Sequence, residues 1–480
     1  MTTKRSVREV HRRAPGIIWL LGATALGWLG GCGSPTVAPS QVATVTVDPA
    51  NTMLDPDSTV QLIATVLASG GGPMNRSVSW NSSDPSIASV SPSGLVTGLD
   101  FGDAEITATS DGVVGTATVA VRKRLESIGA GGFHTCGLTP EGAAFCWGRG
   151  NTGQLGNASF DDQPTPVAVS GGLTFASISP GGLHTCALTS EGVAYCWGLG
   201  GSGQLGDGSS SDQLSPVAIG EFASISSGGA HACGLRTDGA AYCWGFGIDG
   251  RLGNGALEDQ ATPKAVSGGL TFTSISTGAA HTCGVTIDGA AYCWGRGEVG
   301  QLGNGAHTKH AAPVAVSGGL TFASISAGGF HTCGVTTDGS GFCWGRGEDG
   351  QLGTGAIPDE NDPVGTGEIA AESAPVPVST ALAFTSMGTG VVHTCGLTNV
   401  GLAYCWGFAR TVGVNTVVDQ LTPVLVSGGR TLTSMSVGEL HSCGIRADGT
   451  GFCWGQGDSG QLGNGSMTDE TTPVQVAPLP

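Results

Sequence analysis

The residues with the clearest chemical potential are histidine and cysteine, which recur together seven times along the chain. Each copy carries His-x-Cys, nine further residues and then Cys-Trp-Gly, as at His134, Cys136 and Cys146. A histidine and two cysteines held together could bind zinc, whereas paired cysteines in an oxidising compartment could form a disulfide. Seven identical three-ligand sites without a recurring fourth ligand fit structural zinc poorly, so we expect no metal.

The two cysteines of each copy stand on either side of a predicted β-hairpin. Alternating segments such as HTCGLT and AAYCWG flank Glu-Gly or Asp-Gly, whose glycine supplies the positive φ of a tight turn. A turn centred near residue 141 would place Cys136 opposite Cys146, within reach of a disulfide worth roughly 2–3 kcal/mol in the chain-entropy model. We predict seven such bonds: Cys136–Cys146, Cys186–Cys196, Cys233–Cys243, Cys283–Cys293, Cys333–Cys343, Cys395–Cys405 and Cys443–Cys453.

The histidines and tryptophans of the copies have a structural explanation. They occur in every copy, whereas a binding site should differ between copies. We expect the histidines to bond backbone where adjacent repeats meet, and the tryptophans to pack between repeats.

Cys32 is the one cysteine left outside this pairing. Five basic residues within 4–13 and an apolar run over 16–29 precede it, and the run is short for a membrane span. The sequence Leu29-Gly30-Gly31-Cys32 resembles the bacterial lipobox, which implies acylation of Cys32. We therefore predict a lipoprotein signal peptide (1–31), a tether (32–40), and an exported protein held on the cell envelope, at the outer membrane or cell surface, only through its lipid.

Repetition is the strongest signal for the fold. The copies recur at intervals of 47 to 62 residues, and each adds a strand such as FASIS before the hairpin and GQLGNG, a variable loop and a TPV strand after it. Seven β-repeats that cannot bury their faces alone indicate a closed ring of blades. In copy six, Thr411–Asn415 replaces GQLGNG, so we expect a different turn there.

The order G-G-x-H-T-C-x-L-T, C-W-G-x-G, G-Q-L-G-x-G and TPV resembles the regulator-of-chromosome-condensation repeat. This resemblance implies a seven-bladed β-propeller over 125–480. Members of that family include nuclear guanine-nucleotide exchange factors, ubiquitin ligases, photoreceptors and a secreted bacterial inhibitor of β-lactamases. They share protein recognition on one face of the ring, which does not by itself settle a function.

Residues 41–122 read as a separate all-β sandwich of short alternating strands. We expect a core of Trp80, Val60, Leu62, Ile63, Val90, Val96, Ile106 and Ala108. The run VSWNSSDPSIASVSPSGLVTGLDFGDAEITATS resembles the bacterial immunoglobulin-like domain of group 2, which implies a spacer or adhesion module. Arg122-Lys123-Arg124 is expected to be a solvated basic linker to the propeller.

Charge and motifs restrict the function. Residues 32–480 hold 36 acidic and 14 basic residues, and this excess of negative charge disfavours nucleic acid as a partner. The sequence has no G-x-S-x-G, Walker or HExxH motif, so we predict no enzyme and no cofactor.

A partner site should lie where the copies differ. The position after Cys-Trp-Gly holds Arg149, Leu199, Phe246, Arg296, Arg346, Phe408 and Gln456. Arginine and aromatic residues on one rim resemble the composition of interaction hot spots, although several could instead pack under neighbouring loops. The acidic insertion at 357–377 is either a second contact or a tolerated surface loop.

These observations favour a monomeric, non-enzymatic protein-binding scaffold whose propeller face recognises a protein and whose immunoglobulin-like domain serves as a stalk. An inhibitor of an exported enzyme is one concrete form. The alternative is a cell-wall or glycan-binding adhesion module, which should expose aromatic residues around a groove, and only Phe246 and Phe408 suggest one.

Overall fold

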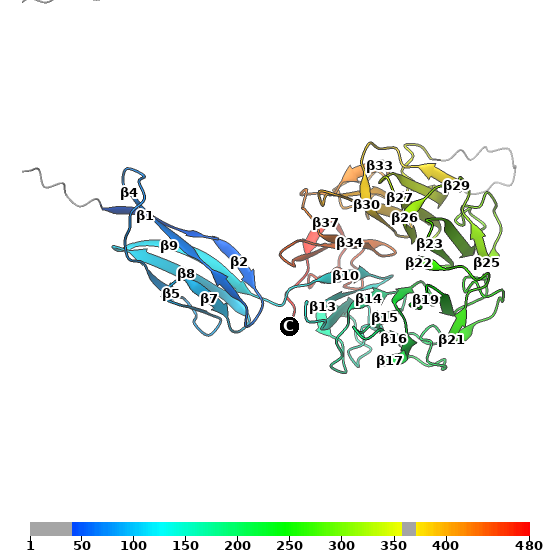
Figure 1. Ribbon diagram of the computed structural model, residues 1–480, viewed down its shortest axis with the longest axis horizontal. Helices are drawn as coiled ribbons and strands as arrows, with labels where there is room; N and C mark the ends of the chain where they lie inside the picture. The colour runs from blue at the N-terminus through cyan, green and yellow to red at the C-terminus, as the bar shows by residue number, and fades with distance from the viewer. Residues whose placement is uncertain (1–40, 358–370) are drawn as a thin grey trace, which may run out of the picture.

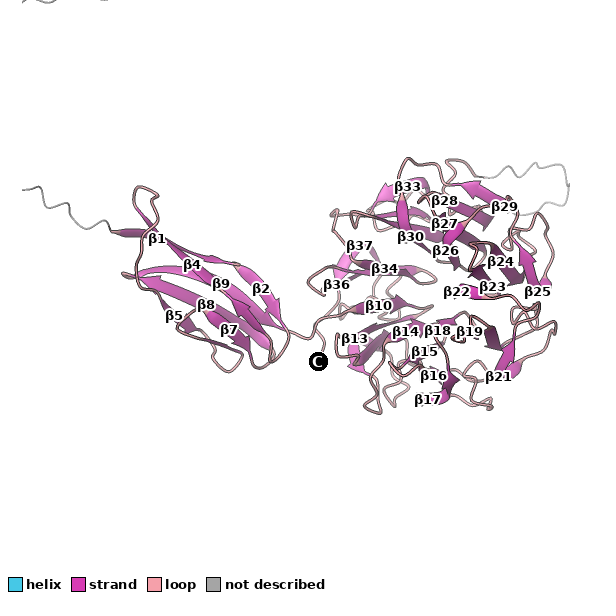
Figure 2. Ribbon diagram, viewed as in Figure 1, coloured by secondary structure: helices cyan, strands magenta, loops and turns pink. Residues whose placement is uncertain are grey.

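The computed structural model describes residues 41–357 and 371–480, which form a sandwich and a ring of sheets joined by a short linker (Figure 1). Every regular element within these residues is a β-strand (Figure 2). The same part of the chain contains no helix of the length and apolarity that a membrane span requires. Cys32 and residues 358–370 of the insertion lie outside the described residues.

The N-terminal sandwich is built from sheets β2-β9-β8-β5 and β3-β7-β6 and the pair β1-β4. Its strands are β1 (Val42–Asp48), β2 (Asn51–Leu54), β3 (Thr59–Gln61), β4 (Ile63–Ala68), β5 (Ser79–Ser82), β6 (Ala88–Val90), β7 (Leu95–Gly98), β8 (Gly102–Ser110) and β9 (Val113–Val121).

Most of the predicted sandwich core is buried. Leu62, Val96, Ile106 and Ala108 are at most 1 % exposed, and Trp80, Val60 and Val90 pack against the same cluster. The prediction was wrong for Ile63, which is 61 % exposed. Successive residues of an extended chain point to opposite sides, so the burial of Leu62 turns its neighbour toward solvent.

The propeller consists of seven four-stranded antiparallel sheets within the described residues, each from one continuous segment. The first four blades are β10 (Ser127–Ala130), β11 (His134–Leu138), β12 (Ala144–Gly148) and β13 (Gln163–Ala168); β14 (Ser177–Pro180), β15 (His184–Leu188), β16 (Val193–Gly198) and β17 (Gln213–Glu221); β18 (Ser224–Ser227), β19 (His231–Leu235), β20 (Ala241–Gly245) and β21 (Gln260–Ala265); and β22 (Phe272–Thr277), β23 (His281–Thr286), β24 (Ala291–Gly295) and β25 (His310–Ala315). The last three are β26 (Phe322–Ala327), β27 (His331–Thr336), β28 (Gly341–Arg346) and β29 (Ala371–Pro377); β30 (Phe384–Thr389), β31 (His393–Thr398), β32 (Ala403–Gly407) and β33 (Gln420–Leu425); and β34 (Ser434–Val437), β35 (His441–Ile445), β36 (Gly451–Gly455) and β37 (Glu470–Gln475).

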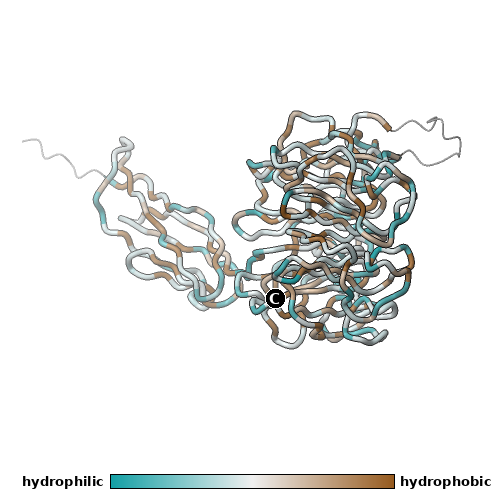
Figure 3. The backbone as a smooth tube through the Cα atoms, turned by 45° about the vertical axis from the view of Figure 1, so that its right-hand side comes forward, coloured by the Kyte–Doolittle hydropathy of each residue, from teal (hydrophilic) through white to brown (hydrophobic). Residues whose placement is uncertain are grey.

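The core of the propeller lies between adjacent blades. One cluster joins Leu155 and Phe175 to Trp197 of the following blade, and equivalent clusters recur around the ring. Figure 3 shows hydrophobic and hydrophilic stretches interspersed throughout the propeller. Because neighbouring blades cover both sides of a blade, its inner strands are buried at every residue, as β11 and β12 are. The indole Nε1 of Trp197 donates a hydrogen bond to the carbonyl oxygen of Gln154 in the preceding blade at 3.0 Å.

A continuous circle of backbone hydrogen bonds closes the ring around its centre. The amide of Gly132 donates to the carbonyl of Gly181 in the next blade at 2.9 Å, and the circle ends where the Glu439 amide donates to Gly131 at 3.1 Å. Glycine is required here: a Cβ on Gly278 would lie 2.2 Å from the carbonyl oxygen of Gly328.

The alternating strand directions give the ring two distinct faces. The loop face, as we call it, carries two connections of each blade. One joins the first strand to the second, and the other joins the third strand to the fourth. The opposite face, with the hairpin turns and the connections between blades, is the turn face. The linker enters on the turn face, where the Leu125 amide donates to Gly449 in the last hairpin turn at 3.1 Å.

The sequence suggested that the basic linker is simply solvated, but its residues make specific contacts. Arg122 pairs with Asp103 at 2.8 Å and Arg124 with Asp55 at 2.9 Å, both aspartates belonging to the sandwich. Lys123 donates to the carbonyl of Pro480 and lies 5.0 Å from the centroid of the Phe101 ring. The linker therefore ties the sandwich to the turn-face edge of the propeller.

Candidate functional site

The seven residues predicted to form a rim occupy equivalent places on the loop face. In every blade the amide of this residue donates to the carbonyl of the residue just before the repeated histidine, at 2.9–3.0 Å. In the first blade Arg149 donates to Phe133, and in the last blade Gln456 donates to Leu440. All seven side chains are half-buried. The fold thus brings Arg149, Leu199, Phe246, Arg296, Arg346, Phe408 and Gln456 to one level around the channel.

The arginines of this rim are held by acidic and aromatic neighbours. Arg296 Nε donates to Glu298 at 3.1 Å, and Arg346 Nε donates to Glu348 at 3.0 Å. Phe330 receives both guanidinium groups on its ring, at 5.7 and 5.8 Å from the centroid. These side chains are fixed by packing while part of each surface stays accessible, a form of preorganisation that favours binding.

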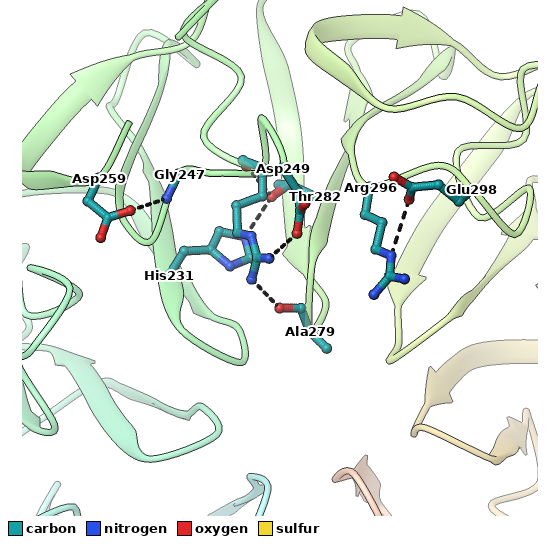
Figure 4. Close-up of polar contacts among 9 residues, drawn as sticks. His231, Gly247, Asp249, Asp259, Ala279, Thr282, Arg296 and Glu298 are labelled. Carbon is teal, nitrogen blue, oxygen red and sulfur yellow. Dashed lines mark hydrogen bonds and ion pairs between the residues drawn. The ribbon is translucent and has the colours of Figure 1, made fainter. Parts of the chain in front are cut away.

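Phe246 lies against an arginine that breaks the repeat. Arg251 replaces the glutamine of GQLG, is 5 % exposed, and lies 4.8 Å from the Phe246 centroid. Its guanidinium donates to the Ala279 carbonyl at 2.7 Å and pairs with Asp249 at 2.6 Å (Figure 4). Arg251 therefore fastens the third blade to the fourth directly beneath the rim.

Sequence reasoning missed an inner set of residues next to the rim. The residue just before each repeated histidine varies between copies, and five of the seven are large apolar residues that stay half-buried beside the channel: Phe133, Leu183, Phe330, Val392 and Leu440. The remaining two are Ala230 and Ala280. Their variation within an otherwise constant motif was the available signal.

A third set, at the tips of the long loops, was also missed. The fourth residue after the glycine that ends GQLG is Phe160, Ser210, Leu257, His307, Ile357, Val417 or Met467. We call these the loop-tip residues. The five large apolar ones are 47–95 % exposed. Of the ten exposed large apolar residues in the described propeller, seven lie on the loop face.

The channel between the blades is narrow. Its cavity of about 80 Å³ is lined mainly by the glycines that close the ring. Glu439 is the one ionisable residue among the described lining residues, at a place where four other blades carry a glycine: Gly132, Gly182, Gly229 and Gly329. Burial raises the pKa of the Glu439 carboxyl.

The repeated histidines join neighbouring blades, but through hydroxyl groups and not through backbone as expected. His134 Nε2 lies 2.7 Å from Thr185 Oγ1, and that hydroxyl donates its hydrogen to the Gln154 carbonyl at 2.9 Å. The hydroxyl can then only accept, so the histidine carries its proton on Nε2. The other bonded pairs are His231–Thr282, His281–Thr332, His331–Thr394, His393–Ser442 and His441–Thr135.

His184 is the exception, because the next blade offers Ala232 in place of a hydroxyl. Both ring nitrogens of His184 are buried without a hydrogen-bond partner. Burial lowers the pKa of His184 to about 4 and that of His134 to about 3, where repulsion from the neighbouring histidines adds to the effect of burial. These imidazoles are neutral structural groups and are enclosed away from any substrate.

All fourteen cysteines of the repeats are bonded in the predicted pairs. Cys136 and Cys146 lie directly opposite one another, with Cα atoms 4.0 Å apart, and the remaining six pairs have the same register. Over the described ranges no group of three or more His, Cys, Asp or Glu side chains is arranged to hold a metal ion.

Copy six keeps the essential part of its altered turn. Val412 replaces the buried leucine and is fully enclosed, and Gly413 keeps a positive φ of 74° against the Trp454 indole. The indole Nε1 of Trp454 has no hydrogen-bond partner, and the same holds for Trp294, which faces Arg251. The hydrogen bond from the indole nitrogen to the backbone carbonyl is therefore absent at the two places where another residue replaces the glutamine of GQLG.

Comparison with known proteins agrees with this architecture. The RCC1-like domain family matches residues 97–366, more than half of the chain, and the chain belongs to that family. Regulator of chromosome condensation (RCC1) repeats match 338–397, 448–480 and 432–461, and the bacterial Ig-like domain (group 2) matches 41–121.

Among individual proteins, the mitochondrial RCC1 domain-containing protein RUG3 of Arabidopsis thaliana is 41 % identical over 46 residues, which is 10 % of either chain. The match thus spans about a tenth of that relative. Prp20p of Saccharomyces cerevisiae has a similar structure (TM-score 0.62, 21 % identity, 71 % of this chain and 87 % of that one), as has human WBSCR16 (0.63, 20 %, 70 % and 94 %). These two likenesses show the fold, whose members are commonly protein-binding or regulatory.

Proposed function

We propose that this protein is a non-enzymatic, protein-binding scaffold of the bacterial cell envelope, with the loop face as its recognition surface and the sandwich as its stalk. The observation that carries the proposal is the division of labour between the two faces. The exposed apolar residues gather on the loop face, whereas the linker and its ion pairs occupy the turn-face edge. A stalk attached in this way leaves the loop face uncovered.

The residues of the loop face suit protein recognition. Arg149, Phe246, Arg296 and Phe408 are anchored by the backbone of their own blades, and the first three also by neighbouring side chains, so little conformational freedom would be lost on binding. Arginine and aromatic residues are also the types that dominate binding energy in protein interfaces. Prp20p, whose fold is similar, has been studied for its binding to Gsp1p and histones, which makes protein recognition compatible with this fold.

The test is a crosslinking capture with the full-length oxidised chain as bait against envelope and secreted proteins. One variant replaces Arg149, Phe246, Arg296 and Phe408 with alanine. The matched control replaces Ile287 and Val400 with serine, because both are exposed on the turn face. We expect a saturable protein partner that the first variant loses and the control keeps.

Capture that survives in both variants would reject the loop face as the site. Retention by purified cell-wall glycan, without any protein partner, would reject protein binding and support a glycan-binding module. The lipid anchor is tested separately: incorporation of a labelled fatty acid should be lost in Cys32→Ser, and label in that variant would refute acylation of Cys32.

A further inference from the structure

The loop-tip residues form a feature that the rim does not explain. Each follows a glycine with positive φ, 69° at Gly156 and 66° at Gly253, which packs against the tryptophan of the next blade. A Cβ on Gly156 would lie 2.6 Å from the indole nitrogen of Trp197. Because this contact recurs in all seven blades, the seven tips stand at equivalent places around the ring.

The loops that carry the tips are held firmly in place. Asp162 Oδ1 accepts a hydrogen bond from the Gly150 amide at 2.8 Å, and Asp259 accepts one from Gly247 at 2.9 Å (Figure 4). The same bond recurs at Asp212, Asp419 and Asp469. Exposure of apolar side chains on such ordered loops is therefore a property of the folded surface, and ordered exposed apolar groups mark interaction sites.

The charge around the tips restricts the occupant. The described residues between the third and fourth strands of the seven blades, counted together with Arg346 at the end of β28, hold thirteen carboxylates and six Lys or Arg side chains. Four of those six cations pair with acids within the same surface: Arg251, Arg296, Arg346 and Arg410. Phe160 is followed directly by Asp161, and Leu257 by Glu258. The centre of the same face adds Glu439.

We propose that the loop-tip residues dock a folded protein with a basic surface, whose apolar pockets receive the tips while its cations face the surrounding carboxylates. This proposal rests on the proposed function and specifies its partner. An anionic membrane and a second copy of this chain would both place negative charge against negative charge. Tips on several blades can be contacted together only by a partner broad enough to span the face, which favours a folded protein over a short peptide.

The test places a photo-crosslinking phenylalanine derivative at Phe160 or Leu257 of the full-length chain. The control carries it at Ile287, which is 82 % exposed on the turn face. In envelope extracts we expect crosslinks from both tips to a basic protein identified by mass spectrometry, and none from the control. Crosslinking to lipid, to a second copy of this chain or to an acidic protein would overturn the proposal.

The affinity of the purified captured protein for variants of this chain then separates the contribution of the apolar tips from that of the surrounding charges. Leu257→Ser should weaken binding roughly tenfold, because the partner would bury the exposed part of the leucine side chain, and serine removes that apolar surface. Ser210→Ala is the matched control, since this tip is already polar. Glu258→Gln should weaken binding several-fold at low salt and should have no effect in about 500 mM salt.

The failure of this inference can be told apart from that of the proposed function. If the rim variant loses the partner but Leu257→Ser and salt leave affinity unchanged, the scaffold stands and the basic, tip-bound partner is rejected. If neither the rim nor the tips affect capture, the loop face has no role and both proposals are rejected.

Discussion

His184 lacks the hydroxyl partner that the other six repeated histidines have, and this difference gives a sharp prediction: Ala232→Thr should stabilise the propeller. Six histidines reach a Thr or Ser hydroxyl of the next blade, and His184 faces Ala232 with no partner for either ring nitrogen. Ala232 pairs with Trp244 in the same register that Thr282 has with Trp294. A threonine here would therefore place its hydroxyl where the other six copies place theirs.

The magnitude follows from the bonds that would form. The new hydroxyl would accept from His184 Nε2 and donate to the carbonyl of Gln204, as Thr185 does with His134 and Gln154. Each hydrogen bond contributes about 1 kcal/mol net, and satisfying a buried donor adds to that, so we expect about 1–2 kcal/mol. Thr282→Ala, which opens a second gap next to Arg251, should cost about 1–3 kcal/mol.

The assay is urea unfolding of the oxidised chain at neutral pH, followed by tryptophan fluorescence because the blade tryptophans are buried. Ala232→Val is the matched control, since valine has the shape of threonine without the hydroxyl. We expect the midpoint to rise for threonine and to rise less, or fall, for valine. Equal gains for both would show that packing accounts for the effect, and a loss for threonine would refute the hydrogen-bond argument.

Three further predictions concern the ring as a whole. Burial lowers the pKa of six of the repeated histidines to about 3 or 4 and that of His231 well below the ordinary 6.5. The unfolded chain therefore binds more protons than the folded chain as the pH falls below 6.5, and stability should drop by up to about 1.4 kcal/mol per histidine per pH unit. The urea midpoint should fall between pH 6.5 and 4, and a flat profile would contradict burial of neutral imidazoles. Gly278→Ala should destabilise by about 1–3 kcal/mol because its Cβ would meet a carbonyl oxygen, whereas Gly201→Ala, with open space around it, should be close to neutral in the same unfolding assay. Replacing Cys136 and Cys146 together with alanine should cost roughly 2–3 kcal/mol, and mass spectrometry of that variant should show six disulfides in the propeller; an unchanged midpoint would exclude a stabilising role for this bond.

The ring and its disulfides could be predicted because their signals are local and recur. The cysteine spacing fixes which residues meet across a hairpin, and the sevenfold recurrence outweighs any ambiguity within one copy. Burial of single residues is harder to infer from pattern, as Ile63 shows: it is as apolar as Leu62 but lies on the other side of the chain.

The contacts between blades and the loop-tip residues of the candidate site were harder to predict. His134 and Thr185 are distant in sequence, so a bond between a histidine and the next hydroxyl cannot be read from one copy. The loop tips escaped notice because Phe160 and Met467 sit among polar residues, where loops are expected to be hydrophilic. Only superposing the copies on the shared glycine shows that large apolar residues recur there.

The way in which the ring closes has a consequence for how the chain can be rearranged. The seam between the last and first blades uses the same interactions as the seam between the first and second blades: Trp147 donates to the Gln461 carbonyl, as Trp197 does to Gln154, and Thr135 meets His441, as Thr185 meets His134. The ends of the propeller also meet, since Leu125 and Leu479 share one cluster. The order of blades is thus cyclic, and the position of the termini is arbitrary. Circular permutants opened between any two blades, with the old ends joined, should fold to the same ring, and the stalk could then be attached beside any chosen blade.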